Sequence, residues 1–258
     1  MSTIVARSSG RSALSPLVST VLPHPRVHVS DVLSLTISTS SFALSSDSSI
    51  EADVTSVPVI GILGGIGSGK SSVVRHMNGL NLCIIDADRI GHELLAEPEI
   101  QAQIRQSFGD RVFSGPETID RSALAKEVFG PSREHDQARQ TLNNILHPAI
   151  RRQIHSQIDS VSRDADAVVI DAALLLEGGW DARCDWLIFV DTPLAVRQQR
   201  VLQNRGWSPE ELARREATQW ALDLKQNKAD FVVDNSASLD KAAEQMKHVF
   251  HSILSHAA

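Results

Sequence analysis

The residues of this chain best suited to phosphate chemistry lie in a glycine-rich stretch that ends in a lysine and two serines. Gly64, Gly69, Lys70 and Ser71 fit the spacing G-x-x-x-x-G-K-[ST], in which successive backbone N–H groups surround an anion. In such a loop the lysine reaches the β- and γ-phosphates of a nucleotide, and the serine hydroxyl is a ligand of Mg²⁺.

The alternative for this stretch is a glycine-rich turn beside an ordinary surface lysine. An apolar segment precedes the loop and a helical segment follows it, which is the context that the phosphate loop requires and a simple turn does not. The sequence therefore predicts a nucleoside triphosphate site that uses Mg²⁺ and consists of Gly64, Gly65, Ile66, Gly67, Ser68, Gly69, Lys70, Ser71 and Ser72.

Acidic residues close two of the apolar stretches that follow. Asp86 and Asp88 are two positions apart and would point to the same side of an extended chain. Beyond the carboxyl end of a parallel strand such a pair can hold Mg²⁺, accept a hydroxyl proton or bind a ribose, although Asp86 could instead cap a helix. Asp171 could orient the metal through water or be a turn residue without chemistry, and Glu177 is equally ambiguous.

Basic residues gather in one helical region, which contains Arg197, Arg200, Arg205, Arg214 and Arg215. Arginines that close over phosphates favour phosphoryl transfer, and of this group we expect Arg205 and Arg200 to act in that way. The alternative is a solvated helix face stabilised by charge pairs. His147, which precedes Pro148, is a further candidate, and no other residue is spaced to make a zinc site with it.

Short apolar stretches alternate with charged, helical ones from residue 57 onward. This order predicts an α/β fold with a parallel sheet flanked by helices on both faces. The expected strands are 57–63, 81–88, 166–177, 184–193 and 230–235, and the expected helices are 70–80, most of 90–160, 193–206, 208–229 and 239–254.

Composition limits the classes of partner. The net charge of the 258 residues is −6, so no broad basic surface for nucleic acid is expected. No apolar run approaches the roughly 20 residues that span a bilayer, so no membrane partner is expected. Cys83 and Cys184 match neither a zinc spacing nor a disulfide framework, which favours reduced thiols in a cytoplasmic protein.

Residues 1–57 differ from the rest of the chain. They are rich in serine and threonine, contain no lysine and show no sustained apolar period, which predicts a disordered extension or a start assigned too far upstream. Arg7, Arg11 and Arg26 precede the first acidic residue, a weak pattern of a transit peptide. The remaining residues, 58–258, are expected to fold as one domain.

Taken in order, the motifs resemble the dephospho-coenzyme A kinase family. The segments that carry the resemblance are "GGIGSGKSS", "IDADRIGHELL", "LHPAIRRQI", "ALLLEGGWDARCDWLIFVDTPLAVRQQR" and "KADFVVDN". They cover residues 58 to about 250. The resemblance implies a P-loop kinase fold with a five-stranded parallel core, a helical substrate-binding insert at about 90–160 and a lid at about 195–225.

The same resemblance implies transfer of the ATP γ-phosphate to the ribose 3′-hydroxyl of dephospho-coenzyme A, the last step of coenzyme A synthesis. It places Asp88 at the acceptor hydroxyl, and we expect Lys70 and Arg205 to act with it in catalysis. His147 and Arg200 are the further residues expected to bind the acceptor substrate.

Three positions depart from the family pattern. Leu63 stands where a threonine is usual, Ala173 replaces a proline, and Asn204 aligns with the lid arginine, one position before Arg205. Another P-loop kinase, acting on a nucleotide or a small alcohol, and a regulatory nucleotide-binding module without catalysis are the alternatives. The sequence makes no prediction of oligomeric state.

Overall fold

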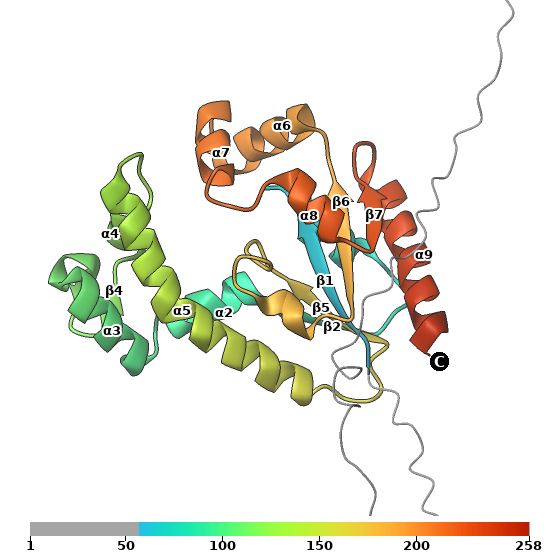
Figure 1. Ribbon diagram of the computed structural model, residues 1–258, viewed down its shortest axis with the longest axis horizontal. Helices are drawn as coiled ribbons and strands as arrows, with labels where there is room; N and C mark the ends of the chain where they lie inside the picture. Colours follow the sequence, from blue (N-terminus) through green and yellow to red (C-terminus); the bar gives the residue numbers. More distant parts are fainter. Residues whose placement is uncertain (1–56, 258) are drawn as a thin grey trace, which may run out of the picture. The chain divides into compact units, whose positions relative to one another are not determined.

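A parallel five-stranded sheet forms the centre of the chain in this computed structural model, which describes residues 57–257 (Figure 1). The strand order is β2-β5-β1-β6-β7, so β1 lies in the middle with β5 and β6 on its two sides. This confirms the predicted fold class, whereas the extension expected at 1–57 falls outside the described residues except for its last position. The strands are β1 Val59–Gly64, β2 Leu82–Asp86, β5 Ala167–Asp171, β6 Trp186–Asp191 and β7 Phe231–Asp234.

Both faces of the sheet are covered, as the continuous apolar strands predict. Every residue of β1 is buried: Val59 and Leu63 belong to one apolar cluster, and Ile60 and Ile62 belong to another. Helix α5 (Arg133–Asp159) packs on the first cluster, and α9 (Leu239–Ala257) packs on the second beside α1 (Lys70–His76). The sheet therefore holds the loops at its carboxyl edge on a rigid base.

The predicted insert is helical and has an apolar core of its own, built around Ile104, Phe108 and Leu124. A short antiparallel ribbon, which the sequence did not predict, pairs Phe113 with Ile119 inside it. The elements of the insert are α2 Ala87–Leu94, α3 Pro98–Phe108, the 3₁₀ helix η2 Asp110–Val112, β3 Phe113–Gly115, β4 Thr118–Ile119, α4 Arg121–Val128 and α5.

The segment expected as one helix at 208–229 is two helices, α7 (Pro209–Glu216) and α8 (Leu222–Lys228), which follow α6 (Leu194–Arg205). The break has a tertiary cause, because the backbone N–H of Trp220 donates to the Glu177 carboxylate at 2.7 Å. We refer to 195–225, the predicted lid, as the lid segment.

Two strand ends also differ from the prediction. The strand expected at 166–177 stops at Asp171, and the next residues form turns, with Gly178 N–H donating to the carbonyl of Leu174. The strand expected at 81–88 stops at Asp86, so Asp88 lies in the first turn of α2. Within 57–257, every helix is too short or too polar to traverse a bilayer.

Candidate active site

The phosphate loop, Gly64–Gly69, curls around the ammonium group of Lys70. Lys70 Nζ donates to the carbonyls of Gly64 and Gly65, at 3.1 and 3.4 Å. Gly67 and Gly69 have φ angles of 76° and 85°, in the left-handed region that favours glycine. Gly69 is also the N-cap of α1, so the loop leads directly into a helix N-terminus, which favours anions.

One carbonyl in the loop is held by three donors. Ser68 O accepts from Asn235 Nδ2 at 2.7 Å, from Thr192 Oγ1 at 3.0 Å and from the Arg200 guanidinium at 3.1 Å. These donors come from the end of β6, from α6 and from the residue after β7. Because a trans peptide points its C=O and N–H in opposite directions, this anchor directs the N–H of Gly69 away from the donors. The loop is thus preorganised before an anion binds.

Sequence reasoning missed two members of this anchor. Asn235 and Thr192 are both buried polar residues, and their role depends on contacts with a loop more than 120 positions away. The only sequence signal was the position of Asn235 in "DFVVDN", directly after the last strand. Arg200 donates to backbone carbonyls of Ser68 and Asn235, and its predicted contact with substrate stays a prediction.

Lys70 lies among the acidic residues expected at this edge of the sheet. Burial is the largest influence on the pKa of Lys70 and lowers it, while the carboxylates of Asp171 and Asp88 act in the opposite direction. Asp171 is buried at the end of β5 and pairs in register with Ile62 of β1. The structure therefore brings the three predicted residues from β5, α1 and α2 within electrostatic reach of one another.

Asp88 has a raised pKa. Partial burial is the largest cause, and the neighbouring Asp86 carboxylate adds to it, while Lys70 and the backbone N–H of Ala173 oppose it. The side chain keeps an exposed side towards solvent. Such a carboxylate is a stronger base than an ordinary aspartate and stays open to a substrate.

Asp86 plays the structural role that the sequence left as an alternative. Its carboxylate caps α2 by accepting the N–H of Arg89 at 2.9 Å, and it pairs with Arg75 at 3.3 Å. The expectation that both carboxylates point to one side of an extended strand is wrong, because the chain turns into α2 immediately after Asp86. Asp86 is thus occupied by the cap of α2, whereas Asp88 lies in the first turn of the helix.

His147 lies inside α5, where its ring meets the ring of Trp180 edge-on at 5.5 Å between centroids. Burial, with the Arg151 charge second, lowers the pKa of His147, so the imidazole is neutral at neutral pH. Glu177 acts in the opposite direction on the same pKa.

An ion pair between Glu177 and Lys225 was not expected. Lys225 is only 1% exposed, and its Nζ lies 2.9 Å from Glu177 Oε1 and 3.1 Å from Gln219 Oε1. Its charge also lowers the pKa of Lys70. A buried lysine needs such a partner, but the charged pattern of the surrounding helix gave no sign that this lysine was buried. The pair joins the turn after β5, where Glu177 lies, to Lys225 at the end of the lid segment.

Lid residue Arg205 is exposed at the end of α6, with its guanidinium 4.8 Å from the ring centroid of Trp207. Its charge is one of those that lower the pKa of Lys70. Asn204 beside it is exposed too. Arg205 thus lies near the loop but makes none of the buried contacts that fix Arg200.

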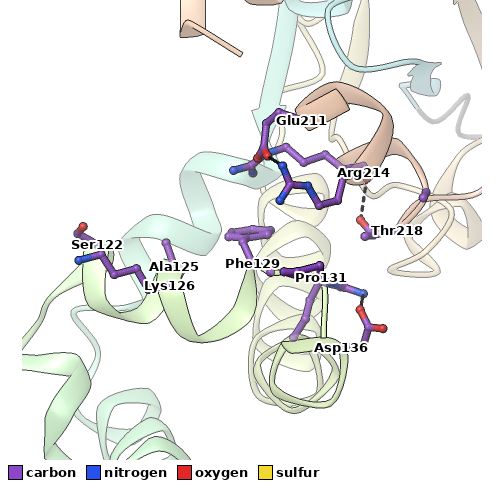
Figure 2. A pocket seen from close by; sticks show the side chains of 13 residues that line it. Ser122, Ala125, Lys126, Phe129, Pro131, Asp136, Glu211, Arg214 and Thr218 are labelled. Carbon is purple, nitrogen blue, oxygen red and sulfur yellow. Dashed lines mark hydrogen bonds and ion pairs between the residues drawn. The ribbon is translucent and has the colours of Figure 1, made fainter. Parts of the chain in front are cut away.

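A pocket of about 530 Å³ opens between the insert and the lid segment (Figure 2). Phe129 forms one wall, and the Arg215 guanidinium lies over its ring at 4.6 Å and over the Trp207 ring at 4.1 Å. Four basic and two acidic side chains give the pocket a positive balance. The charged lining residues are Lys126, Arg139, Arg214, Arg215, Asp136 and Glu211.

Comparison with known proteins agrees with this geometry. The family model of dephospho-CoA kinase matches residues 58–241. The chain belongs to the dephospho-CoA kinase family. It is 37% identical over 195 residues to the dephospho-CoA kinase of Symbiobacterium thermophilum, covering 73% of this chain and 78% of that one. With the enzyme of Rhodopirellula baltica it shares 32% identity over 208 residues, 80% of this chain and 95% of the relative.

Solved structures are similar as well. A dephospho-CoA kinase from Campylobacter jejuni superimposes with a TM-score of 0.57 at 26% identity, covering 78% of this chain and 98% of that one. Protein TT1252 from Thermus thermophilus superimposes with a TM-score of 0.62 at 29% identity, covering 76% of this chain and 98% of that one. Dephospho-CoA kinases catalyse the final step of coenzyme A biosynthesis, and this chain is a kinase of that family.

Two of the three departures from the family pattern can now be placed. Leu63 is buried in β1 and packs in the apolar cluster of the sheet, so its side chain is part of the core. Ala173, in the loop after β5, places its backbone N–H against Asp88. Proline has no backbone N–H, so a proline at position 173 could not make this contact.

Proposed function

We propose that the chain transfers the γ-phosphate of ATP to the ribose 3′-hydroxyl of dephospho-coenzyme A, giving coenzyme A and ADP. The observation that carries this proposal is that Lys70, Asp171 and Asp88 lie within electrostatic reach of one another at the carboxyl edge of the sheet, where the phosphate loop also lies. The loop would hold the donor, and Asp88 would face the acceptor.

On the donor side, residues Gly64–Ser72 would bind the phosphates of ATP. Lys70, released from the Gly64 and Gly65 carbonyls, would neutralise the charge that develops on the transferring phosphoryl group. Ser71 in the first turn of α1 and the buried Asp171 offer oxygen ligands, which suit Mg²⁺ with part of its water shell retained. When bound, the ion would supply further positive charge to the phosphates, with Ser71 as a direct ligand and Asp171 acting through water.

On the acceptor side, Asp88 would orient the 3′-hydroxyl and take its proton as the bond to phosphorus forms. The raised pKa supports this role, because the carboxylate is more basic than usual yet opens to solvent. Arg205 would approach the phosphates from the exposed end of α6 as a transition-state cation.

The rest of the acceptor would lie between the insert and the lid segment. The positive pocket lined by Arg139 and Arg214 suits a diphosphate, and Phe129 offers an apolar wall. His147, neutral and half-buried, would contact the acceptor where the insert approaches the sheet. A cytoplasmic location is part of the proposal, and it rests on the composition of the chain.

A substrate panel tests the proposal. ATP consumption is measured with dephospho-coenzyme A, with AMP, with adenosine and with a set of small alcohols, and the product is analysed for a 3′-phosphate. We expect turnover with dephospho-coenzyme A far above that with the compounds that lack its diphosphate arm. Faster turnover of another alcohol would favour a different P-loop kinase, and tight ATP binding without turnover would favour a regulatory module.

A further inference from the structure

Arg197 is a buried arginine at the start of α6 that the proposed reaction does not use. It is 4% exposed. Its Nε donates to the carbonyl of Thr192 at 3.1 Å, and one of its terminal nitrogens donates to the carbonyl of Ile66 in the phosphate loop at 3.4 Å. That same nitrogen forms an ion pair with the carboxylate of Glu216. A single guanidinium therefore contacts the loop and the lid segment at once.

The packing of Arg197 against the loop is close. A Cβ atom on Gly65 would lie 3.0 Å from the terminal nitrogen of Arg197, and one on Gly67 would lie 3.0 Å from its carbonyl oxygen. Two glycines are thus needed for the loop to pass Arg197. Any change in the shape of the loop on binding phosphates must move this arginine or strain its contacts.

Glu216 is the last residue of α7, nineteen positions further along the chain than Arg197. The ion pair therefore joins the first turn of α6 to the far end of α7, on either side of the exposed turn that carries Arg205. By contrast, Arg214 and Arg215 pair with Glu211 within α7, and Arg200 donates to the carbonyls of Ser68 and Asn235.

We propose that Arg197 is a positioning residue that couples nucleotide binding in the phosphate loop to the position of the lid segment through Glu216. The inference rests on the proposed function in one respect: it takes Arg205 as the residue that the lid segment brings to the phosphates. Phosphates bound to the loop would hold the Ile66 carbonyl, which lies two residues before the anchored Ser68, in one position. This would hold the Arg197 guanidinium and, through Glu216, the end of α7. The Arg205 guanidinium would then be held over the phosphates only when nucleotide is present.

The test uses the full chain and trypsin, which can cut after the exposed Arg205, the last residue of α6. A non-hydrolysable ATP analogue with Mg²⁺ should slow this cleavage in the wild type by about tenfold, a typical coupling between two sites. In Glu216→Gln the analogue should still bind with similar affinity, but the protection should disappear. Glu210→Gln, the same change at an exposed position of α7 that does not contact the loop, should keep the protection.

Removing one partner of a buried ion pair can destabilise the fold, so a second variant is included. Arg197→Met with Glu216→Leu replaces the pair by apolar side chains, which often preserves stability. We expect its thermal midpoint and analogue affinity to stay near wild type, while the protection is lost and kcat falls by about 10- to 100-fold, as for a misplaced catalytic group.

A folded double variant with wild-type protection and wild-type kcat would overturn the proposal. So would protection that is lost equally in Glu210→Gln. Because the protease assay needs no acceptor, it can succeed even if dephospho-coenzyme A is not the substrate, and the two proposals fail separately.

Discussion

The phosphate loop and the outer part of the lid segment are both proposed to contact ATP, but one is fixed by buried contacts and the other by exposed ones. Backbone atoms of the loop are fixed by buried donors, three of them on the carbonyl of Ser68 alone. The outer part of the lid segment, with Arg205 at the end of α6, is exposed and is held by contacts with the ring of Trp207 and by ion pairs within α7.

The two regions differ in how strongly their structure is stabilised before a ligand binds. Buried hydrogen bonds to the Ser68 carbonyl are formed in the absence of nucleotide, so binding needs little rearrangement at this end of the loop. Surface ion pairs and cation–π contacts are each worth about 1 kcal/mol or less, so the exposed outer part of the lid segment can be repositioned by a ligand at small cost. We therefore expect changes in the fixed region to alter chemistry or nucleotide affinity, and changes in the exposed region to alter turnover alone.

The largest effect should come from Asp88→Asn, which keeps the shape of the side chain and removes the proposed base. Turnover of dephospho-coenzyme A should fall by about 10² to 10⁴, the range for a positioned general base. ATP affinity should be nearly unchanged, because the proposal assigns Asp88 to the acceptor and not to the nucleotide. Steady-state kinetics and nucleotide binding measure the two quantities, and normal turnover would place the base elsewhere.

Lys70→Ala should have the next largest effect. The ammonium that now contacts the carbonyls of Gly64 and Gly65 would be lost from the transferring phosphate, and kcat should drop by about 10² to 10³. The fold should survive, because the side chain is not part of the apolar core. Circular dichroism serves as the control, and near-normal kcat in a folded variant would mean that the loop binds nucleotide for another purpose.

Arg205→Ala tests the lid segment, with Asn204→Ala as its matched neighbour. The exposed Arg205 makes no buried contact in the described structure, so the substitution should reduce kcat by about tenfold or more through lost transition-state charge without lowering the thermal midpoint. Asn204 carries no charge, and its replacement should change kcat little. Equal small effects of both variants would indicate that another arginine of the lid segment supplies the transition-state charge.

Thr192→Val tests the anchor of the loop. Valine keeps the shape of threonine but cannot donate to the Ser68 carbonyl, and one net hydrogen bond is worth about 1 kcal/mol. We expect ATP affinity to weaken by about fivefold, and Thr192→Ser to restore it. Titration with ATP at constant temperature measures this, and equal affinities of all three proteins would show that two donors suffice.

The smallest effect concerns pH. The proposed role of Asp88 as a base requires its ionised form, so kcat/KM should fall as the pH is lowered through the pKa of this carboxyl, which is raised above its ordinary value. Asp86→Asn removes a negative charge that contributes to the increase, so the pKa of Asp88 should decrease and the acidic limb should move to lower pH. Asparagine still caps α2 well, which keeps the fold as a control. An unmoved limb would argue against Asp88 as the titrating group.

The sequence by itself determined the alternation of strands and helices and the position of the phosphate loop. Both depend on local rules: apolar strands buried on two faces read as continuous runs, and glycines at fixed spacing before a lysine form an anion-binding turn. The same rules brought out Lys70, Asp88 and Asp171 as candidates, and the structure places them together.

Only the tertiary structure decided what each charged side chain does. Asp86 and Asp88 are alike in sequence, yet Asp86 caps α2 and Asp88 lies near Lys70, because the strand ends at Asp86 and Asp88 lies in the first turn of the helix. Arg197 and Lys225 read as surface charges of polar helices, yet both are buried, because Glu216 and Glu177 reach them across the fold. Ion pairing of this kind depends on the distance between elements remote in sequence, which periodicity and spacing do not encode.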